Sequence, residues 1–213
     1  FLLLTLLFSF ITFSQPNTEV FLFDLNTEGG MFELANFKNI SNNEGYDNQP
    51  SFLNNNIILY SGTRKGQTDI VKYTINTGEK KFINYTKNGG EYSPQRIPNS
   101  EDISAVRLDN SGLQRLYKYN INSGVSEEII PNLKVAYPLW YNDHVLFSAV
   151  IGENALELVK SDLNNNSNNI LEKNIGNYNN MRKENQIDKN EKFETLNFVL
   201  HFEDSTKRKF HHI

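Results

Sequence analysis

The sequence predicts an all-β fold, a β-propeller built from four-stranded antiparallel blades. Three observations support this prediction. Short β-rich runs recur with no long helical period, residues typical of tight turns separate them, and both features repeat along the chain. The Lys72-Tyr73 and Lys118-Tyr119 pairs are 46 residues apart, and so are Gly78 and Gly124. This spacing is typical of one four-stranded blade per repeat.

The first repeat spans Gly45 to Thr86. Its residue pattern predicts four strands, at Pro50–Phe52, Ile57–Ser61, Asp69–Ile75 and Lys81–Tyr85. Turns are expected at Asn54–Asn56, Gly62–Gly66 and Asn76–Glu79. Alternation along the third strand places Ile70, Lys72 and Thr74 on one face and Val71, Tyr73 and Ile75 on the other. Such a small sheet cannot bury both faces alone, so it needs neighbouring sheets.

Two further copies follow, and part of another precedes. The second copy is predicted at Tyr92–Pro94, Asp102–Val106 and Leu116–Ile121, and the third at Tyr137–Trp140, Val145–Ala149 and Leu156–Leu163. The run Val20–Asn26, with Gly29-Gly30 after it, is interpreted as the outer strands of a preceding blade. About four blades are therefore expected between residues 17 and 176.

These motifs carry a family resemblance. The segments NQPSF, DIVKY, a Thr-Gly turn and GEYSPQRIPNSEDISAVRLDNSGLQRLYKY resemble the TolB-like (WD40-like) β-propeller repeats of exported Gram-negative proteins, particularly the Bacteroidetes type. The resemblance covers residues 19–176. It implies a six-bladed ring that serves as a rigid platform for other proteins or envelope components. About four blades would then be a truncated ring or an open arc. Similar repeats form the propeller portions of prolyl-oligopeptidase-like enzymes, so fold alone does not decide function.

The N-terminal run Phe1–Phe13 is entirely apolar except for its hydroxyl side chains. It is shorter than the roughly 20 residues that a membrane-spanning helix needs, and it has the length of a signal-peptide core. Thr12 and Ser14 supply small residues for cleavage before Gln15. We therefore interpret residues 1–14 as the remnant of a signal peptide in a sequence that begins inside its reading frame. A buried first strand or helix is the alternative.

Composition narrows the function classes. The formal net charge is −4, with acidic and basic residues interspersed, which argues against a nucleic-acid partner. Cysteine is absent, so disulfides, thiolate metal sites and a lipid-anchored N-terminus are excluded. The predicted location is periplasmic or secreted, without lipidation and without a membrane span.

Motifs for catalysis are missing from this sequence. It contains no Gly-x-Ser-x-Gly elbow, no His-Glu-x-x-His metal motif and no phosphate-binding loop. Its four histidines are His144, His201, His211 and His212; the first is expected in a solvated turn, and adjacent side chains such as the last two point apart. No catalytic residue, metal ligand or cofactor is therefore assigned.

Two groups of residues are candidates for binding, although neither is assigned. The first group consists of charged side chains near the hairpins: Arg64, Asp69, Arg107, Asp109 and Arg115. They either form a polar rim that binds a partner, or they cap turns and lie at the solvated edges of the hairpins. Tyr92, Tyr137 and Trp140 hold related positions near the inner strands and the channel entrance. They either line a binding surface or pack between blades.

The pattern changes after Gly176. Residues 177–192 are polar and lack a strand period, so they are interpreted as a linker, and residues 193–213 as a divergent strand and tail. Phe193–Glu203 could cover the open edge of the arc or begin another blade. The predicted function is a non-enzymatic exported module that binds a protein or cell-envelope ligand. The alternative is the propeller part of a larger hydrolase, or of a lyase, whose catalytic residues lie outside this sequence.

Overall fold

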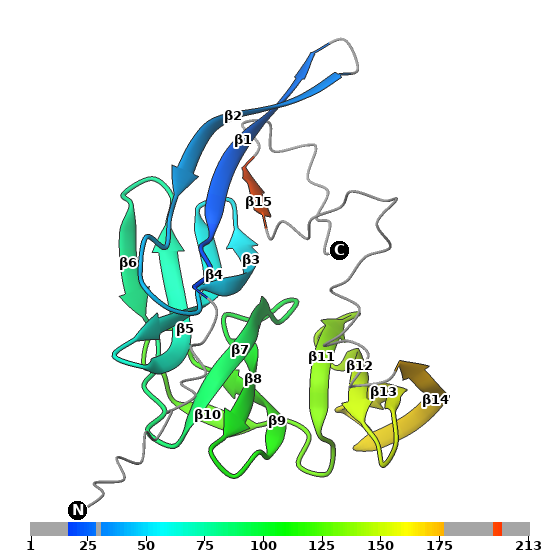
Figure 1. Ribbon diagram of the computed structural model, residues 1–213. Coiled ribbons are helices and arrows are strands. Elements are labelled where there is room, and N and C mark those ends of the chain that lie inside the picture. Colours follow the sequence, from blue (N-terminus) through cyan, green and yellow to red (C-terminus); the bar gives the residue numbers. More distant parts are fainter. Residues whose placement is uncertain (1–16, 29–30, 177–197, 202–213) are drawn as a thin grey trace, which may run out of the picture.

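The described residues form four β-sheets that are arranged in an arc (Figure 1). The computed structural model describes residues 17–28, 31–176 and 198–201. Three of the sheets have four strands and one has three, and the described residues contain no helix. Consequently none of them forms a helix capable of crossing a membrane. The all-β, propeller-like prediction is confirmed, although the described sheets form an arc and do not close a ring.

Each sheet is built from strands that are consecutive in the sequence, except that β15 also joins the first sheet. Sheet 1 contains β1 (Phe21–Glu28), β2 (Met31–Asn39) and β15 (Phe198–His201). Sheet 2 contains β3 (Asn48–Asn54), β4 (Ile57–Arg64), β5 (Gln67–Thr74) and β6 (Glu79–Phe82). Sheet 3 contains β7 (Gly89–Arg96), β8 (Ile103–Asp109), β9 (Gln114–Tyr119) and β10 (Ser126–Glu128). Sheet 4 contains β11 (Val135–Trp140), β12 (Val145–Ile151), β13 (Leu156–Asp162) and β14 (Ser167–Gly176).

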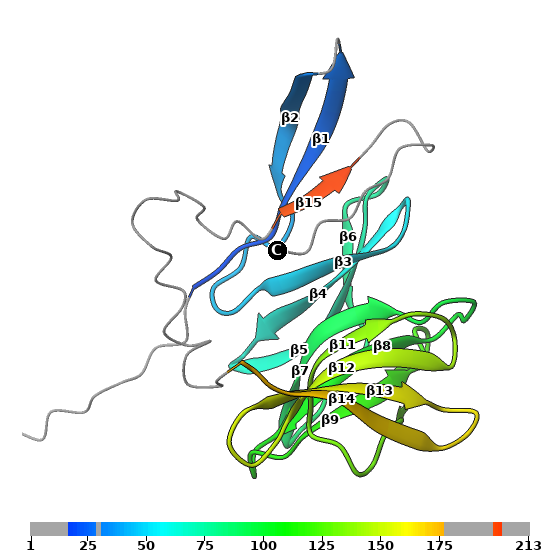
Figure 2. The same ribbon diagram turned by 90° about the vertical axis from the view of Figure 1, so that its right-hand side faces the viewer.

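Strands β3, β7 and β11 face the centre of the arc, whereas β6 and β14 lie at its periphery (Figures 1 and 2). Sheets 2, 3 and 4 are antiparallel throughout, as expected for strands joined by tight turns. The first strand of each of these sheets is thus the inner strand of its sheet (Figures 1 and 2), and β3 packs against β7.

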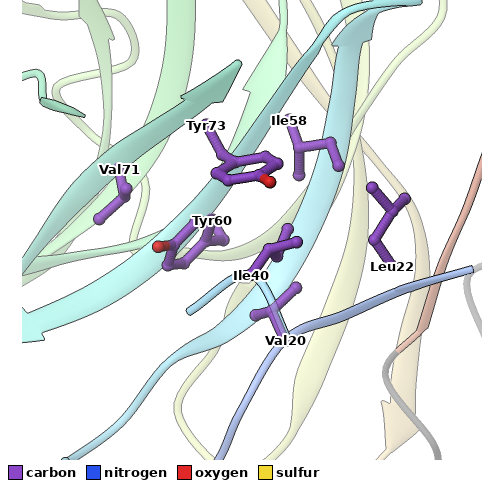
Figure 3. Close-up of a cluster of buried hydrophobic side chains, with 7 residues drawn as sticks. All are labelled: Val20, Leu22, Ile40, Ile58, Tyr60, Val71 and Tyr73. Atoms are coloured by element: carbon purple, nitrogen blue, oxygen red, sulfur yellow. The ribbon is translucent and has the colours of Figure 1, made fainter. Parts of the chain in front are cut away.

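The core consists of three apolar layers, one between each pair of successive sheets. Figure 3 shows the first, in which Val20, Leu22 and Ile40 meet Ile58, Tyr60, Val71 and Tyr73 of sheet 2. The second joins Leu59, Ile70 and Ile83 to Ile103, Ala105 and Tyr119. The third joins Val106, Leu116 and Ile130 to Val135, Leu146, Val150 and Val159. Each sheet thus shields an apolar face of the next.

Strand β5 illustrates how the sequence produces this arrangement. Val71 and Tyr73 belong to the first layer, whereas Ile70, on the opposite face, belongs to the second. All three side chains are at most 2% exposed. The predicted alternation along this strand is confirmed, and it explains why one four-stranded sheet would be unstable alone.

One turn is shorter than the sequence predicts. Gly62, Thr63 and Arg64 continue β4 and pair with Asp69, Thr68 and Gln67, so only Lys65-Gly66 forms the turn. Both turn residues have positive φ, as a two-residue hairpin requires. Gly62 is needed for packing, because a Cβ there would lie 2.5 Å from a methyl carbon of Val71.

The fourth strand of sheet 2 also differs from its predicted range. Strand β6 occupies Glu79–Phe82 instead of Lys81–Tyr85. The Ile83 amide still donates to the Ile70 carbonyl at 2.8 Å, but the Ile70 amide donates to the Asn84 side-chain oxygen at 2.9 Å. The Asn84 side chain therefore replaces the backbone as the next partner and ends the ladder.

Sheet 1 partly matches its sequence interpretation. The run Val20–Asn26 mostly coincides with β1, which is the middle strand, antiparallel to β2 and parallel to β15. Within Phe193–Glu203, residues Phe198–His201 form β15 and pair with β1, not with the edge of sheet 4. The predicted leader at 1–14, the linker at 177–192 and His211-His212 lie outside the described residues.

Candidate binding surface

The three inner strands share a local irregularity that directs their side chains. Pro50, Pro94 and Pro138 are spaced 44 residues apart. The strand register shifts close to each proline, between β3 and β4, between β7 and β8, and between β11 and β12. Gln49 and Ser93, which precede the first two prolines, both have positive φ. Such bulges reorient the neighbouring side chains, and Tyr92 and Tyr137 lie at two of them.

Tyrosines from three successive repeats lie close together at this point. The rings of Tyr46 and Tyr92 meet edge to face, with centroids 5.9 Å apart. Burial raises the pKa of Tyr46 to about 12, and the Tyr92 and Tyr137 phenols add to the shift. Tyr137 is 50% exposed. These residues, here called the tyrosine cluster, offer apolar ring faces and phenol hydroxyls on the inner side of the arc.

The cluster contains only two of the three aromatic candidates named from the sequence. Trp140 lies instead between sheets 3 and 4, where its Nε1 donates to Ser104 Oγ at 2.8 Å and its ring packs against the third apolar layer. Trp140 therefore packs between blades, and part of its side chain also lines the groove described below. Tyr46, which sequence analysis did not single out, directly precedes Asp47, the position that corresponds to Glu91 when Pro50 and Pro94 are aligned.

A groove of about 390 Å³ opens between sheets 3 and 4, beyond the ends of β7 and β11. Its apolar lining comes from Ile97, Ile129, Trp140 and Leu163. Its charged lining comes from Asp102, Lys118, Glu127, Glu128 and Asp143. The groove thus combines an aromatic side chain with several carboxylates.

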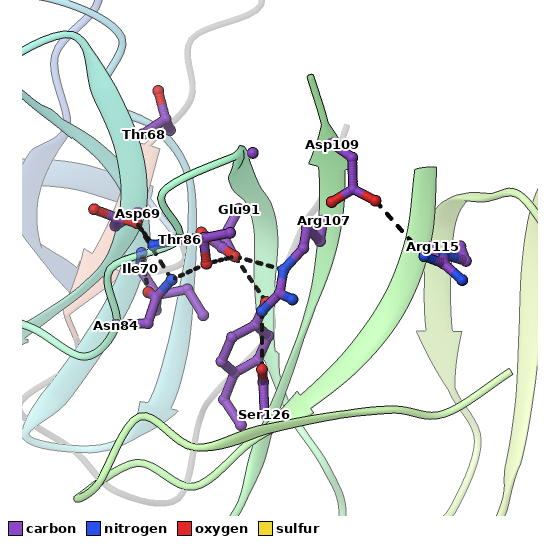
Figure 4. A network of polar contacts seen from close by, with 12 residues as sticks. Thr68, Asp69, Ile70, Asn84, Thr86, Glu91, Arg107, Asp109, Arg115 and Ser126 are labelled. Carbon is purple, nitrogen blue, oxygen red and sulfur yellow. Dashed lines mark hydrogen bonds and ion pairs between the residues drawn. The ribbon is translucent and has the colours of Figure 1, made fainter. Parts of the chain in front are cut away.

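A buried polar network connects sheets 2 and 3 (Figure 4). Glu91 is fully buried, and its Oε1 accepts hydrogen bonds from Arg107 Nε and Tyr119 Oη, both at 2.9 Å, and from the Thr86 hydroxyl. The Thr86 backbone amide in turn donates to Asp69 Oδ1 at 3.1 Å. Two buried carboxylates from different repeats are thus linked through one threonine.

The charged candidates from the hairpins do not form one rim. Asp69 and Arg107 belong to the buried network, and Arg64 lies 3.4 Å from Asp69 Oδ2 and 4.2 Å from the centre of the Phe82 ring. Arg115 pairs with Glu128 at 2.8 Å and with Asp109 at 3.6 Å. All five side chains form ion pairs within or between strands, but Asp69 and Arg107 are buried in the network and do not cap turns or lie at solvated hairpin edges, as the structural alternative expected.

The described histidines do not form a metal site. His144 lies in the turn after β11, with its Nδ1 2.6 Å from Asp143 Oδ1. Among the residues that the structure describes, no three His, Asp or Glu side chains are placed to hold a metal ion.

Comparison with known proteins gives the fold its context. No family model and no curated protein matches this chain. Among solved structures, TolB from Acinetobacter baumannii superposes with a TM-score of 0.53 and 15% identity, over 73% of this chain and 42% of that protein. The fold is a TolB-like β-propeller. A candidate TolB from Agrobacterium tumefaciens gives a TM-score of 0.53 at 14% identity, over 68% of this chain and 57% of its own length.

A third structural neighbour is an enzyme. A puromycin-hydrolyzing peptidase from Mycobacterium tuberculosis superposes with a TM-score of 0.54 at 10% identity, over 70% of this chain but only 24% of the peptidase. The chain therefore spans less than two thirds of each of these proteins. At such low identities the likeness concerns the fold, and function has to be argued from the surfaces of this chain.

Proposed function

We propose that this chain is a non-enzymatic binding module of the bacterial cell envelope, periplasmic or secreted, and that its ligand is a protein. The observation that carries this proposal is the tyrosine cluster. Three successive repeats each supply one tyrosine to the same inner region, and the last of these residues is half exposed. Tyrosine is enriched in protein interfaces because it combines a large apolar area with a hydrogen-bonding group.

The architecture suits such a role. Buried layers on both sides of sheets 2 and 3 and on one side of sheet 4 hold the inner strands, so Tyr92 and Tyr137 project from packed strands. A preorganised surface loses less conformational entropy on binding than a flexible loop does. Leu139, two residues after Tyr137 on β11, is 67% exposed and extends the apolar surface. The TolB-like fold and the resemblance to exported repeat proteins support the envelope location.

The test is capture from a cell-envelope extract by the immobilised chain, followed by a comparison of variants. Tyr137→Ala should reduce capture of the main bound protein at least tenfold, because it removes the exposed ring of the cluster. Tyr141→Ala is the matched control, since Tyr141 is 74% exposed but lies in the turn after β11. Equal capture by both variants and the unchanged chain would overturn the proposed site. Hydrolysis of peptides by the chain alone would overturn the non-enzymatic role.

A second candidate function is the propeller part of a larger hydrolase. The observation that favours it is the superposition on about a quarter of the mycobacterial peptidase. In that case the tyrosine cluster would face a catalytic domain, and the chain would bind that domain when the two are mixed as separate polypeptides.

A further inference from the structure

The groove between sheets 3 and 4 has a lining of mixed chemistry. Ile97, Ile129 and Leu163 provide aliphatic surface, and Trp140 provides an aromatic ring held in place by its hydrogen bond to Ser104. A ring that is fixed in this way cannot turn away to fill the cavity. The indole is therefore held beside the aliphatic lining of the groove.

The charges around this aliphatic lining do not balance. Four carboxylates and one ammonium group line the groove. Glu127 pairs with Lys118 at 3.2 Å, and Glu128 pairs with Arg115 at 2.8 Å. Asp102 accepts a hydrogen bond only from the neutral Asn120 amide at 3.2 Å, and Asp143 contacts His144 at 2.6 Å. In the described part of the chain, Asp102 therefore has no cationic partner within ion-pair distance, and the ring of His144 is the side chain that contacts Asp143.

We propose that this groove binds a long basic side chain, arginine or lysine, of the protein ligand. The proposal rests on the proposed binding function and adds the chemistry of the partner. Both side chains have an aliphatic stem and a cationic end, which matches an apolar lining beside uncompensated carboxylates. The Trp140 ring adds a surface on which a guanidinium or ammonium group can stack. The negative charge near Asp102 and Asp143 attracts the cationic end and disfavours acidic ligands.

The groove can be tested directly because Trp140 is the single tryptophan of the chain. The probes are acetylated, amidated tri-arginine and tri-glutamate, titrated into the full chain while tryptophan emission is recorded at two salt concentrations. Tri-arginine should change the emission saturably, and its affinity should fall as salt rises. Tri-glutamate should have no effect.

Two variants localise the binding. The double variant Asp102→Asn, Asp143→Asn should weaken tri-arginine binding at least tenfold, with an unchanged urea midpoint as evidence of intact folding. Glu101→Gln removes an exposed neighbouring carboxylate that does not line the groove, and it should bind within twofold of the unchanged chain. No saturable emission change, or equal affinity in the double variant, overturns the proposal.

The groove proposal and the proposed binding function can fail independently of each other. If tri-arginine fails to bind while Tyr137→Ala still abolishes capture from the extract, the groove proposal is wrong and the binding module stands. If tri-arginine binds but nothing is captured, the groove proposal stands as a property of the fold and the proposed function is wrong.

Discussion

Arg107 Nε lies 2.9 Å from Glu91 Oε1, and the two residues face each other across the β7 and β8 strands. Glu91 is completely buried and Arg107 is 15% exposed. The positions that correspond to Glu91 by proline spacing hold Asp47 in sheet 2 and Val135 in sheet 4. The acidic residue is therefore not required by the repeat itself. Where it is present, Glu91 Oε1 accepts from a guanidinium and two hydroxyl groups, whereas the buried Asp47 accepts from the Thr63 amide and the Asn43 side chain.

Arg107→Ala should destabilise the chain by about 3–5 kcal/mol, because it leaves the buried Glu91 carboxylate without its cation. Lys118→Ala is the control, since the pair of Lys118 with Glu127 is exposed and should contribute less than about 1 kcal/mol. Urea unfolding followed by circular dichroism measures both. Similar losses in the two variants would show that the network contributes no more than a surface ion pair.

Asp69 should give the chain an unusual dependence of stability on pH. Burial raises the pKa of its carboxyl group, and the nearby Glu91 carboxylate adds to the shift, while the Thr86 amide and Arg64 oppose it. A carboxyl whose pKa is higher in the folded state binds its proton more tightly there. This group therefore stabilises the folded state progressively as pH falls through the folded pKa towards the unfolded value of about 3.9.

The measurement compares the unchanged chain with Asp69→Asn, which cannot titrate. Between pH 7 and about 4.5, the free energy of unfolding of the unchanged chain should rise relative to that of the variant. A relative fall over the same range would mean that Asp69 behaves as an ordinary ion-paired carboxylate with a depressed pKa.

Gly124 should tolerate no side chain. It has a φ of +72°, and a Cβ there would lie 2.3 Å from the Ile83 carbonyl oxygen, where sheet 3 approaches sheet 2. Gly112 has a φ of +83° but no atom within 4 Å of the corresponding point, so it is a matched control. Gly112→Ala should cost about 1–2 kcal/mol through backbone strain alone. Gly124→Ala should cost about 1–3 kcal/mol more, because rigid backbone must move. Equal decreases in melting temperature for the two variants would show that sheets 2 and 3 move apart at little cost to accommodate the added methyl group.

Much of the fold follows from the sequence because its core obeys a simple period. Alternation along β5 separates Ile70 from Val71 and Tyr73, and repetition every 46 residues places further apolar strands to cover both faces. Turn residues with positive φ, such as Gly78 and Gly124, mark the same point in two blades. These signals are local or periodic, so no tertiary information is needed to read them.

The candidate surfaces depend on contacts between repeats, which no period encodes. Asp69 and Glu91 are linked through Thr86, and Tyr46 meets Tyr92 only after two sheets have stacked. The end of β6 could not be predicted because the Asn84 side chain replaces a backbone partner. Trp140 was placed among the binding candidates because an aromatic residue near an inner strand has the same sequence signal whether it faces a ligand or the next blade.

The bond between Trp140 and Ser104 provides the last prediction. Ser104 is fully buried, and its Oγ accepts a hydrogen bond from the indole at 2.8 Å across the layer between sheets 3 and 4. Trp140→Phe and Ser104→Ala should each cost about 1–3 kcal/mol, since each leaves one polar group without its partner.

The double variant should cost clearly less than the sum of the two, because the second change removes the group that the first left unsatisfied. Circular dichroism has to follow the urea unfolding, since Trp140→Phe removes the only tryptophan. Strictly additive losses would mean that the indole and the hydroxyl do not interact. The Trp140 ring would then be held by packing alone. The hydrogen bond to Ser104 could no longer explain its fixed orientation in the groove.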